Sequence, residues 1–190
     1  MLEEILLGVG ALLVLAAIVV LFQFNRLVTL RNRIRESWSN VGTELQRRHD
    51  LVPNLVESAK GYAAHERAVF DGLSKARSAA MEMLAAGAGA AQATPSEQAL
   101  SNGLGRLLGL AEAYPKLQAS ANFLALQQEL ANTEDRIQAA RRFYNGNVRD
   151  YRNQVDTFPG IIWRKRFPPD AAAFFEAEPA ATATPQVRMA

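Results

Sequence analysis

The sequence predicts an all-α protein: an N-terminal transmembrane helix followed by a long antiparallel four-helix bundle. Three observations lead to this prediction. An apolar run without charges opens the chain, apolar residues then recur every three or four positions, and no stretch alternates apolar and polar residues as a strand would. We expect a transmembrane anchor at residues 1–25, a helical bundle at 26–176 and a disordered tail at 177–190.

Residues 5–22 carry no charged or strongly polar side chain, and a run of about 20 such residues can span a bilayer. The acidic residues before the run and the lack of a small-residue cleavage site argue against a cleaved signal peptide. No basic residue precedes the run, so the arginines after it place the main domain in the cytoplasm of a single-pass protein, with a periplasmic domain as the alternative. We expect these arginines at the membrane interface: Arg26, Arg31, Arg33 and Arg35.

The first soluble helix follows the anchor without a break signal, because no proline occurs before Pro53. Its apolar residues lie on one face, so the anchor and this helix are predicted to form one rod that ends near Arg48. Asp50 as an N-cap and Pro53 in a first turn then predict the start of a second helix, whose heptad seam runs from Val52 to Met83.

Residues 85–94 have a low-complexity composition that is typical of a flexible connection. Thr94, Pro95 and Glu97 then form a capping-box start for the third helix. A fourth helix runs from Pro115 to Pro159–Gly160. Long seams with this spacing predict coiled-coil packing. The predicted core includes Leu55, Tyr62, Val69, Leu73, Leu126, Leu130, Ile137 and Tyr144.

Composition narrows the functions open to these 190 residues. The absence of cysteine excludes disulfide frameworks, thiolate zinc sites, cysteine nucleophiles and lipid attachment to an N-terminal Cys. His49 and His65 are predicted to lie roughly 20 Å apart along one axis, too far to share an ion within one chain. The glycines from Gly103 to Gly109 lack the spacing and the preceding strand of a phosphate-binding loop. We expect no catalytic residues, no metal and no cofactor.

Two stretches carry a specific pattern. The first is Arg47-Arg48-His49-Asp50-Leu51-Val52-Pro53-Asn54-Leu55-Val56, with Lys60-Gly61-Tyr62 and His65-Glu66; the second runs from Asn122 through Thr133-Glu134 to Tyr144-Asn145. Together with Leu30-Arg31 and Ser37-Trp38-Ser39, this pattern resembles the LemA family over about residues 27–176. The resemblance implies a bacterial, membrane-anchored helical bundle without an established enzymatic activity. One branch of the family is associated with intracellular membrane formation, and some relatives carry a lipoprotein-type start that this chain lacks.

Polar residues on or near the apolar stripes are candidate contacts between helices: Asn54, Glu66, Asn122, Gln128, Glu134, Arg141 and Asn145. One interpretation is a subunit contact or a ligand groove. The interpretation we favour is a buried polar network that fixes the register of the helices. In that interpretation His49 and Asp50 cap the predicted turn, and Glu66 pairs with an arginine across the bundle.

The segment Trp163-Arg164-Lys165-Arg166-Phe167 mixes aromatic and basic residues. Four antiparallel helices return this segment to the bilayer, where basic side chains meet anionic lipid and aromatic ones suit the interface. A net charge of only +2 argues against the alternative of a nucleic-acid partner. We therefore expect Trp163, Arg164, Lys165 and Arg166 at the membrane surface.

These observations predict a non-enzymatic, membrane-anchored scaffold of the bacterial inner membrane that self-associates and organises or shapes the bilayer. Its expected partners are the lipid bilayer and further copies of the chain. Phe70 and Leu124 lie off the seams of their helices, so we expect them at the contact between copies. The alternative is a regulatory or signalling module that binds another membrane protein.

Overall fold

The computed structural model describes residues 1–176 and confirms an all-α chain, with no strand in that part. The predicted disordered tail, 177–190, lies outside the described residues. The helices are α1 (Leu2–Lys60), α2 (Arg67–Ala85), α3 (Ala90–Ala113), α4 (Pro115–Gln118), α5 (Ala121–Asp156) and the short 3-10 helices η1 (Gly160–Trp163) and η2 (Pro169–Ala171).

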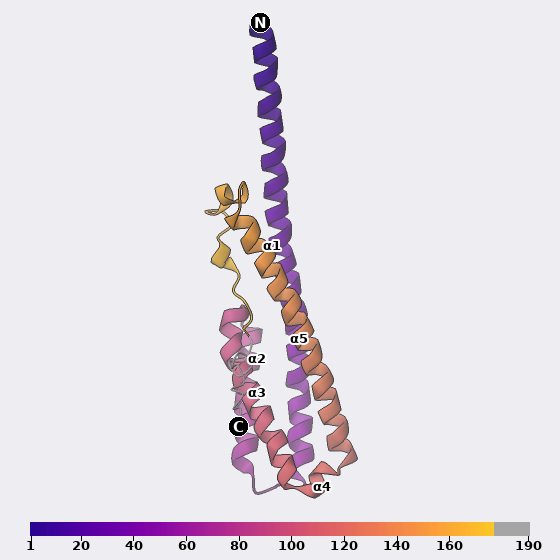
Figure 1. The fold of residues 1–190 in the computed structure, drawn as a ribbon. Helices are drawn as coiled ribbons and strands as arrows, with labels where there is room; N and C mark the ends of the chain where they lie inside the picture. Colours follow the sequence, from indigo (N-terminus) through magenta and orange to yellow (C-terminus); the bar gives the residue numbers. More distant parts are fainter. Residues whose placement is uncertain (177–190) are drawn as a thin grey trace, which may run out of the picture.

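The four long helices run antiparallel, and α1 extends far beyond the other three (Figure 1). α1 packs mainly along α5, and α2 packs mainly along α3. α2 returns from the far end of α1, α3 runs away again, and α5 comes back along α1 (Figure 1). The end of α5 therefore lies beside the part of α1 that leaves the bundle, which is the order of directions that the sequence predicts.

The predicted reversal at Asp50 is wrong, because α1 continues through Pro53 to Lys60. A proline inside a helix has no N–H to donate to the carbonyl four residues earlier, which here belongs to His49. Arg77 of α2 supplies the missing donor: its Nε lies 2.6 Å from the His49 carbonyl oxygen. A tertiary contact therefore satisfies the carbonyl that the proline leaves free.

The chain reverses instead at residues 61–66, so the predicted seam from Val52 to Met83 is divided between two helices. Tyr62, which we expected in the core, lies in this connection and is 45% exposed. The expected arginine partner of Glu66 is also replaced: the Tyr114 hydroxyl donates to Glu66 Oε1 at 3.1 Å.

α3 begins at Ala90, five positions before the predicted start, so residues 85–94 are not the flexible connection that we expected. The turn is formed by residues 86–89, with Gly87 in the left-handed region at φ 72°. The backbone N–H of Gly89 donates to Gln92 Oε1 at 3.1 Å, which caps the helix. The predicted capping box is therefore wrong: Thr94 donates to the carbonyl of Ala90 in the first turn, and Glu97 is buried inside the bundle.

The predicted fourth helix is interrupted near its start. α4 ends at Gln118, and α5 begins after Ser120, whose hydroxyl accepts from the N–H of Phe123 at 3.5 Å. α5 then runs unbroken to Asp156, close to the predicted end.

Two clusters of buried apolar residues fill the bundle. One joins α1 beyond Val52 to α2, α3, α4 and the first part of α5. The other joins α1 before Leu45 to the second part of α5 and to Phe167 and Phe175 of the C-terminal segment. Of the predicted core, the structure buries Leu55, Leu73, Leu130, Ile137 and Tyr144, and Val69 and Leu126 are half-buried.

The contact between α2 and α3 is close enough to require a glycine at position 103. A Cβ added to Gly103 would lie 3.0 Å from Leu73 Cδ1 and 3.5 Å from Leu73 Cα. Gly103→Val should therefore lower the free energy of unfolding by about 1–3 kcal/mol more than Gly105→Val, because a Cβ at Gly105 meets no atom within 4 Å. Denaturant titration of both variants in detergent measures this difference, and equal effects would contradict the close packing.

Candidate functional site: a buried charged layer and an open groove

A layer of charged and polar side chains, called the charged layer below, separates the two apolar clusters. Arg48 and His49 come from α1, Glu97 from α3 and Glu134 from α5. Arg48, His49 and Glu97 are each at most 3% exposed, whereas the side chain of Glu134 is 36% exposed. Charged groups are rarely buried unless they are paired, so this layer is the most unusual feature of the bundle interior.

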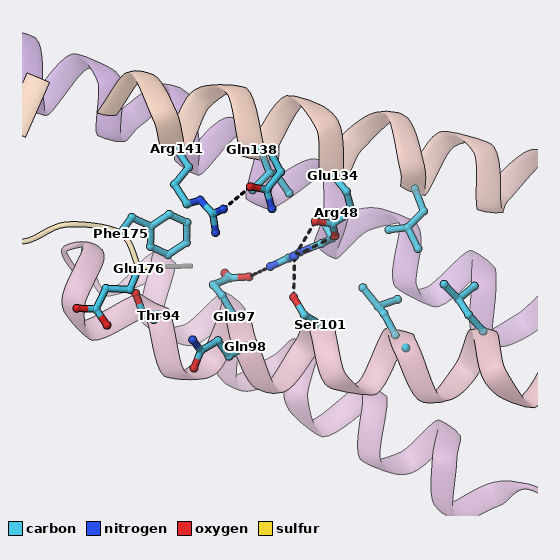
Figure 2. A pocket seen from close by; sticks show the side chains of 15 residues that line it. Arg48, Thr94, Glu97, Gln98, Ser101, Glu134, Gln138, Arg141, Phe175 and Glu176 are labelled. Carbon is cyan, nitrogen blue, oxygen red and sulfur yellow. Dashed lines mark hydrogen bonds and ion pairs between the residues drawn. The ribbon is translucent and has the colours of Figure 1, made fainter. Parts of the chain in front are cut away.

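Arg48 lies at the centre of the layer (Figure 2). Its Nη2 donates to Glu97 Oε2, and its Nη1 lies 3.0 Å from Glu134 Oε1 and 3.1 Å from Ser101 Oγ. His49 Nε2 lies 3.0 Å from Glu97 Oε1. Because an ionised carboxylate only accepts hydrogen bonds, the Nε2 nitrogen of His49 carries the proton.

The hydrogen bonds and opposite charges in the layer keep both Arg48 and Glu97 ionised. Burial alone would raise the pKa of Glu97, but the hydrogen bond from His49 and the positive charge of Arg48 hold it below its usual value. Burial alone would likewise lower the pKa of Arg48, but the negative charges of Glu134 and Glu97 raise it overall. Arg48 and Glu97 therefore form a stable ion pair at neutral pH.

All four long helices contribute to this layer. The contact from Arg77 to the His49 carbonyl adds α2 to the three helices that carry the charged groups. Among the described residues, Arg48 Nε and His49 Nδ1 are buried without a hydrogen-bond partner. Such a network specifies one arrangement of the helices, since an axial slip would place unpaired charge against apolar residues.

A groove of about 340 Å³ opens between α3 and α5, and Arg48, Glu97 and Glu134 line it (Figure 2). Leu104, Leu108 and Leu130 also line it, so the groove combines an apolar surface with charged groups. The other lining side chains come from the two helices and from Phe175 and Glu176 of the C-terminal segment. A binding groove was one of the two interpretations that the sequence allowed for Glu134 and Arg141.

Side chains of α5 hold the C-terminal segment at one end of this groove. Asn145 pairs with the backbone of Phe175 in both directions: the Phe175 N–H donates to Asn145 Oδ1 at 2.9 Å, and Asn145 Nδ2 donates to the Phe175 carbonyl at 3.0 Å. The Tyr144 hydroxyl donates to the Ala173 carbonyl at 2.8 Å. Burial raises the pKa of Tyr144, so this hydroxyl keeps its proton at neutral pH.

The remaining predicted inter-helix residues differ in their contacts. Asn122 Nδ2 donates to Ser58 Oγ of α1 at 3.4 Å, and Asn54 lies exposed in the same shallow surface region. Gln128 is exposed, and within residues 1–176 its side chain donates to Asn132 of its own helix, which corrects the expectation of an inter-helix contact. Arg141 donates to Gln138 of its own helix and lines the groove.

The two residues expected at a contact between copies lie in different environments. Phe70 is 3% exposed and packs in the core, which corrects the expectation that it lies on a free face. Leu124 is 48% exposed on α5. The apolar stripe of α2 is wide enough to include Phe70, as is usual for helices of globular proteins.

The predicted membrane-interface residues lie on two segments, the part of α1 that follows its apolar run and the turn that follows α5. The Trp163 ring lies 5.3 Å from that of Phe24 in an edge-on contact. Arg164 pairs with Asp156 at 3.3 Å, and Lys165 and Arg166 are exposed beside it. Of the four arginines after the apolar run, Arg31 is half-buried and Arg26, Arg33 and Arg35 are exposed.

Sequence reasoning missed the roles of Arg48, His49 and Glu97. The signal for Glu97 was its position: it precedes Leu100, Leu104 and Leu107 by three, seven and ten residues, which places it on the buried face of α3. The signal for Arg48 and His49 was the motif Arg47–Asp50, which we assigned to a helix end and a turn.

Fold and site together define a helical-bundle protein. Its first helix is long and apolar enough to cross a membrane, and no part of its most apolar segment is buried. The model of the LemA family matches residues 37–189, so the chain belongs to the LemA family. A comparison with curated proteins gave no match.

Glu97→Ala should lower the free energy of unfolding at pH 7 by about 3–5 kcal/mol, because it leaves Arg48 buried with half of its pairing. Glu112→Ala, at an exposed position of the same helix, is the control and should have little effect. Denaturant titration in detergent measures both.

The sign of the pH dependence gives a second readout of the same variant. The folded pKa of Glu97 is lowered, so its contribution is complete above its unfolded pKa of about 4.3 and is lost as pH falls through the lower folded value. The difference between the unmodified chain and Glu97→Ala should therefore shrink below about pH 4. A difference that stays constant between pH 7 and pH 3 would contradict the ionised pair.

Proposed function

We propose that the protein is a non-enzymatic scaffold, anchored in the bacterial inner membrane by the start of α1, with its bundle in the cytoplasm. The observation that carries the proposal is the continuity of α1 over 59 residues. The same helix contains the exposed apolar run and, from Leu27 to Ala59, residues that are buried in the bundle. Residues 25–60 of this helix would extend roughly 50 Å from the membrane surface.

Rigidity supports a scaffold. α1 enters the bundle without a linker, and the charged layer ties it to α2, α3 and α5. A bundle held in this way keeps one orientation relative to its anchor, whereas a flexible linker would let it move independently of the membrane. A fixed orientation is what a protein needs in order to arrange copies of itself, or other proteins, at a bilayer.

Self-association is the second part of the proposal. Leu124 and Phe143, 48% and 63% exposed, are the large apolar side chains that α5 presents to solvent. Anchors confined to one membrane raise the effective concentration of the bundles, so a small apolar contact can suffice to assemble them. An array of such bundles would organise or shape the membrane beneath it.

The groove between α3 and α5 favours a second candidate function, a regulatory module that binds another membrane protein. Its lining combines leucines with Glu97, Glu134 and Arg141, and such mixed surfaces are typical of sites that recognise a specific partner. In this case one foreign protein would copurify with the chain in a fixed stoichiometry.

Leu124→Glu tests the self-association. Amine-reactive cross-linking in intact membranes should give a ladder of species above the monomer, and Leu124→Glu should remove it by placing a charge in the contact. Gln128→Glu, one turn further along the exposed face of α5, is the matched control and should keep the ladder. A monomer in both membranes and mild detergent would contradict self-association and favour the regulatory module.

A further inference from the structure

Three large apolar side chains are exposed at the turn that follows α5. Phe158 is 82% exposed, Ile162 67% and Ile161 47%. They lie within five consecutive residues, and few other large apolar residues of the bundle are as exposed. A cluster of this kind marks an interaction surface more often than a chance exposure, because each side chain loses favourable burial.

The turn after α5 lies beside the end of the apolar run of α1. The rings of Trp163 and Phe167 contact the ring of Phe24 at centroid distances of 5.3 and 5.5 Å. Gln154 at the end of α5 donates to Gln23 at 2.8 Å. These contacts hold the turn beside the end of the apolar run of α1, where α1 leaves the bundle (Figure 1). The exposed cluster therefore lies on a turn that packs against the end of the apolar run.

The turn is fixed in this position by close packing. A Cβ on Gly160 would lie 1.8 Å from the carbonyl oxygen of Gln154, so the backbone folds directly onto the end of α5. Phe167 is 3% exposed and packs in the apolar cluster that joins α1 to the second part of α5. The apolar side chains between these two points therefore have a defined place relative to the anchor.

The charge around the cluster fits an anionic surface. Lys165 and Arg166 are exposed directly after η1, and Arg26 is exposed on the adjoining part of α1. No acidic residue occurs from Thr157 to Pro169. Basic side chains beside apolar ones are the combination that binds the headgroups of anionic lipids.

We propose that Phe158, Ile161 and Ile162 insert into the headgroup layer of an anionic bilayer, as a second membrane contact beside the anchor. This inference rests on the proposed function, in which α1 spans the membrane. The sequence analysis placed Trp163 at the membrane surface. In the present proposal Trp163 instead holds the turn against α1, and Phe158, Ile161 and Ile162 enter the lipid. With two points of attachment, the bundle keeps one tilt and one rotation relative to the membrane plane.

Nitroxide labels on single cysteines test this insertion in the full chain, which contains no native cysteine. The label at Ile162→Cys reports the turn, and Glu112→Cys, exposed on α3, reports the water phase. The label at Val14→Cys reports the anchor. The protein is reconstituted into vesicles of equal parts phosphatidylglycerol and phosphatidylcholine, and collision of each label with oxygen is compared with collision with a water-soluble nickel complex.

The Ile162 label should favour oxygen, as the Val14 label does, while the Glu112 label should favour the nickel complex. If Val14 favours oxygen and Ile162 behaves as Glu112 does, the second contact is refuted and the anchor stands. If Val14 itself favours the nickel complex, the proposed anchoring is refuted as well.

A charge variant tests the lipid class. Lys165→Glu combined with Arg166→Glu should shift the Ile162 label toward the nickel complex in the anionic vesicles. In vesicles of phosphatidylcholine alone the same variant should leave the label unchanged. An equal shift in both kinds of vesicle, or no shift in either, would overturn the assignment to anionic lipid. Circular dichroism of each variant checks that its helix content is that of the parent chain.

Discussion

The pairing of Arg48 with Glu97 and Glu134 is the interaction on which the arrangement of the bundle depends. α3 and α5 leave a groove between them, and Arg48 of α1 is the group that contacts a carboxylate from each. An axial slip of a helix would disturb the close packing of the apolar residues, as at Gly103 against Leu73. In the charged layer the same slip would also bury unpaired charge. Apolar packing supplies stability, and the layer selects one register.

The same layer explains how α1 remains one helix. Pro53 removes the backbone donor for the His49 carbonyl, and Arg77 replaces that donor from α2. The helix that carries the apolar run is thus the helix that carries Arg48, so the charged layer fixes the position of the bundle helices relative to the apolar run. At the other end of the bundle, Trp163 and Phe167 contact Phe24 and hold the segment after α5 beside the end of the apolar run. These two connections are the structural basis of the scaffold of fixed orientation that we propose.

The sequence was sufficient to predict the helical class, the apolar N-terminal helix, the alternation of helix directions and most of the core. The first of these helices depends on an uninterrupted apolar run, and the bundle helices depend on apolar residues that recur every three or four positions. Both patterns can be recognised within a single helix, without its neighbours. The errors came where a distant residue overrides a local signal. Asp50 and Pro53 have the pattern of a helix start, but Arg77 stabilises a continuous helix. Thr94 and Glu97 have the pattern of a capping box, but the Glu97 carboxylate instead accepts hydrogen bonds from Arg48 and His49. Phe70 and Gln128 were assigned to the wrong environment for a related reason. The width of the buried face of a helix depends on the helices that pack against it, and the sequence of that helix alone does not give this width.

The continuity of α1 is the central claim, and a distance between two spin labels tests it most directly. Asn25 and Lys60 are both exposed on α1, and the chain has no native cysteine to interfere with labelling. In a straight helix these positions lie about 52 Å apart, so double electron–electron resonance on the Asn25→Cys/Lys60→Cys variant in lipid nanodiscs should give one narrow peak near that distance. A reversal at Asp50 would bring Lys60 back toward Asn25 and give a distance of about 25 Å. That result would contradict a continuous α1 helix.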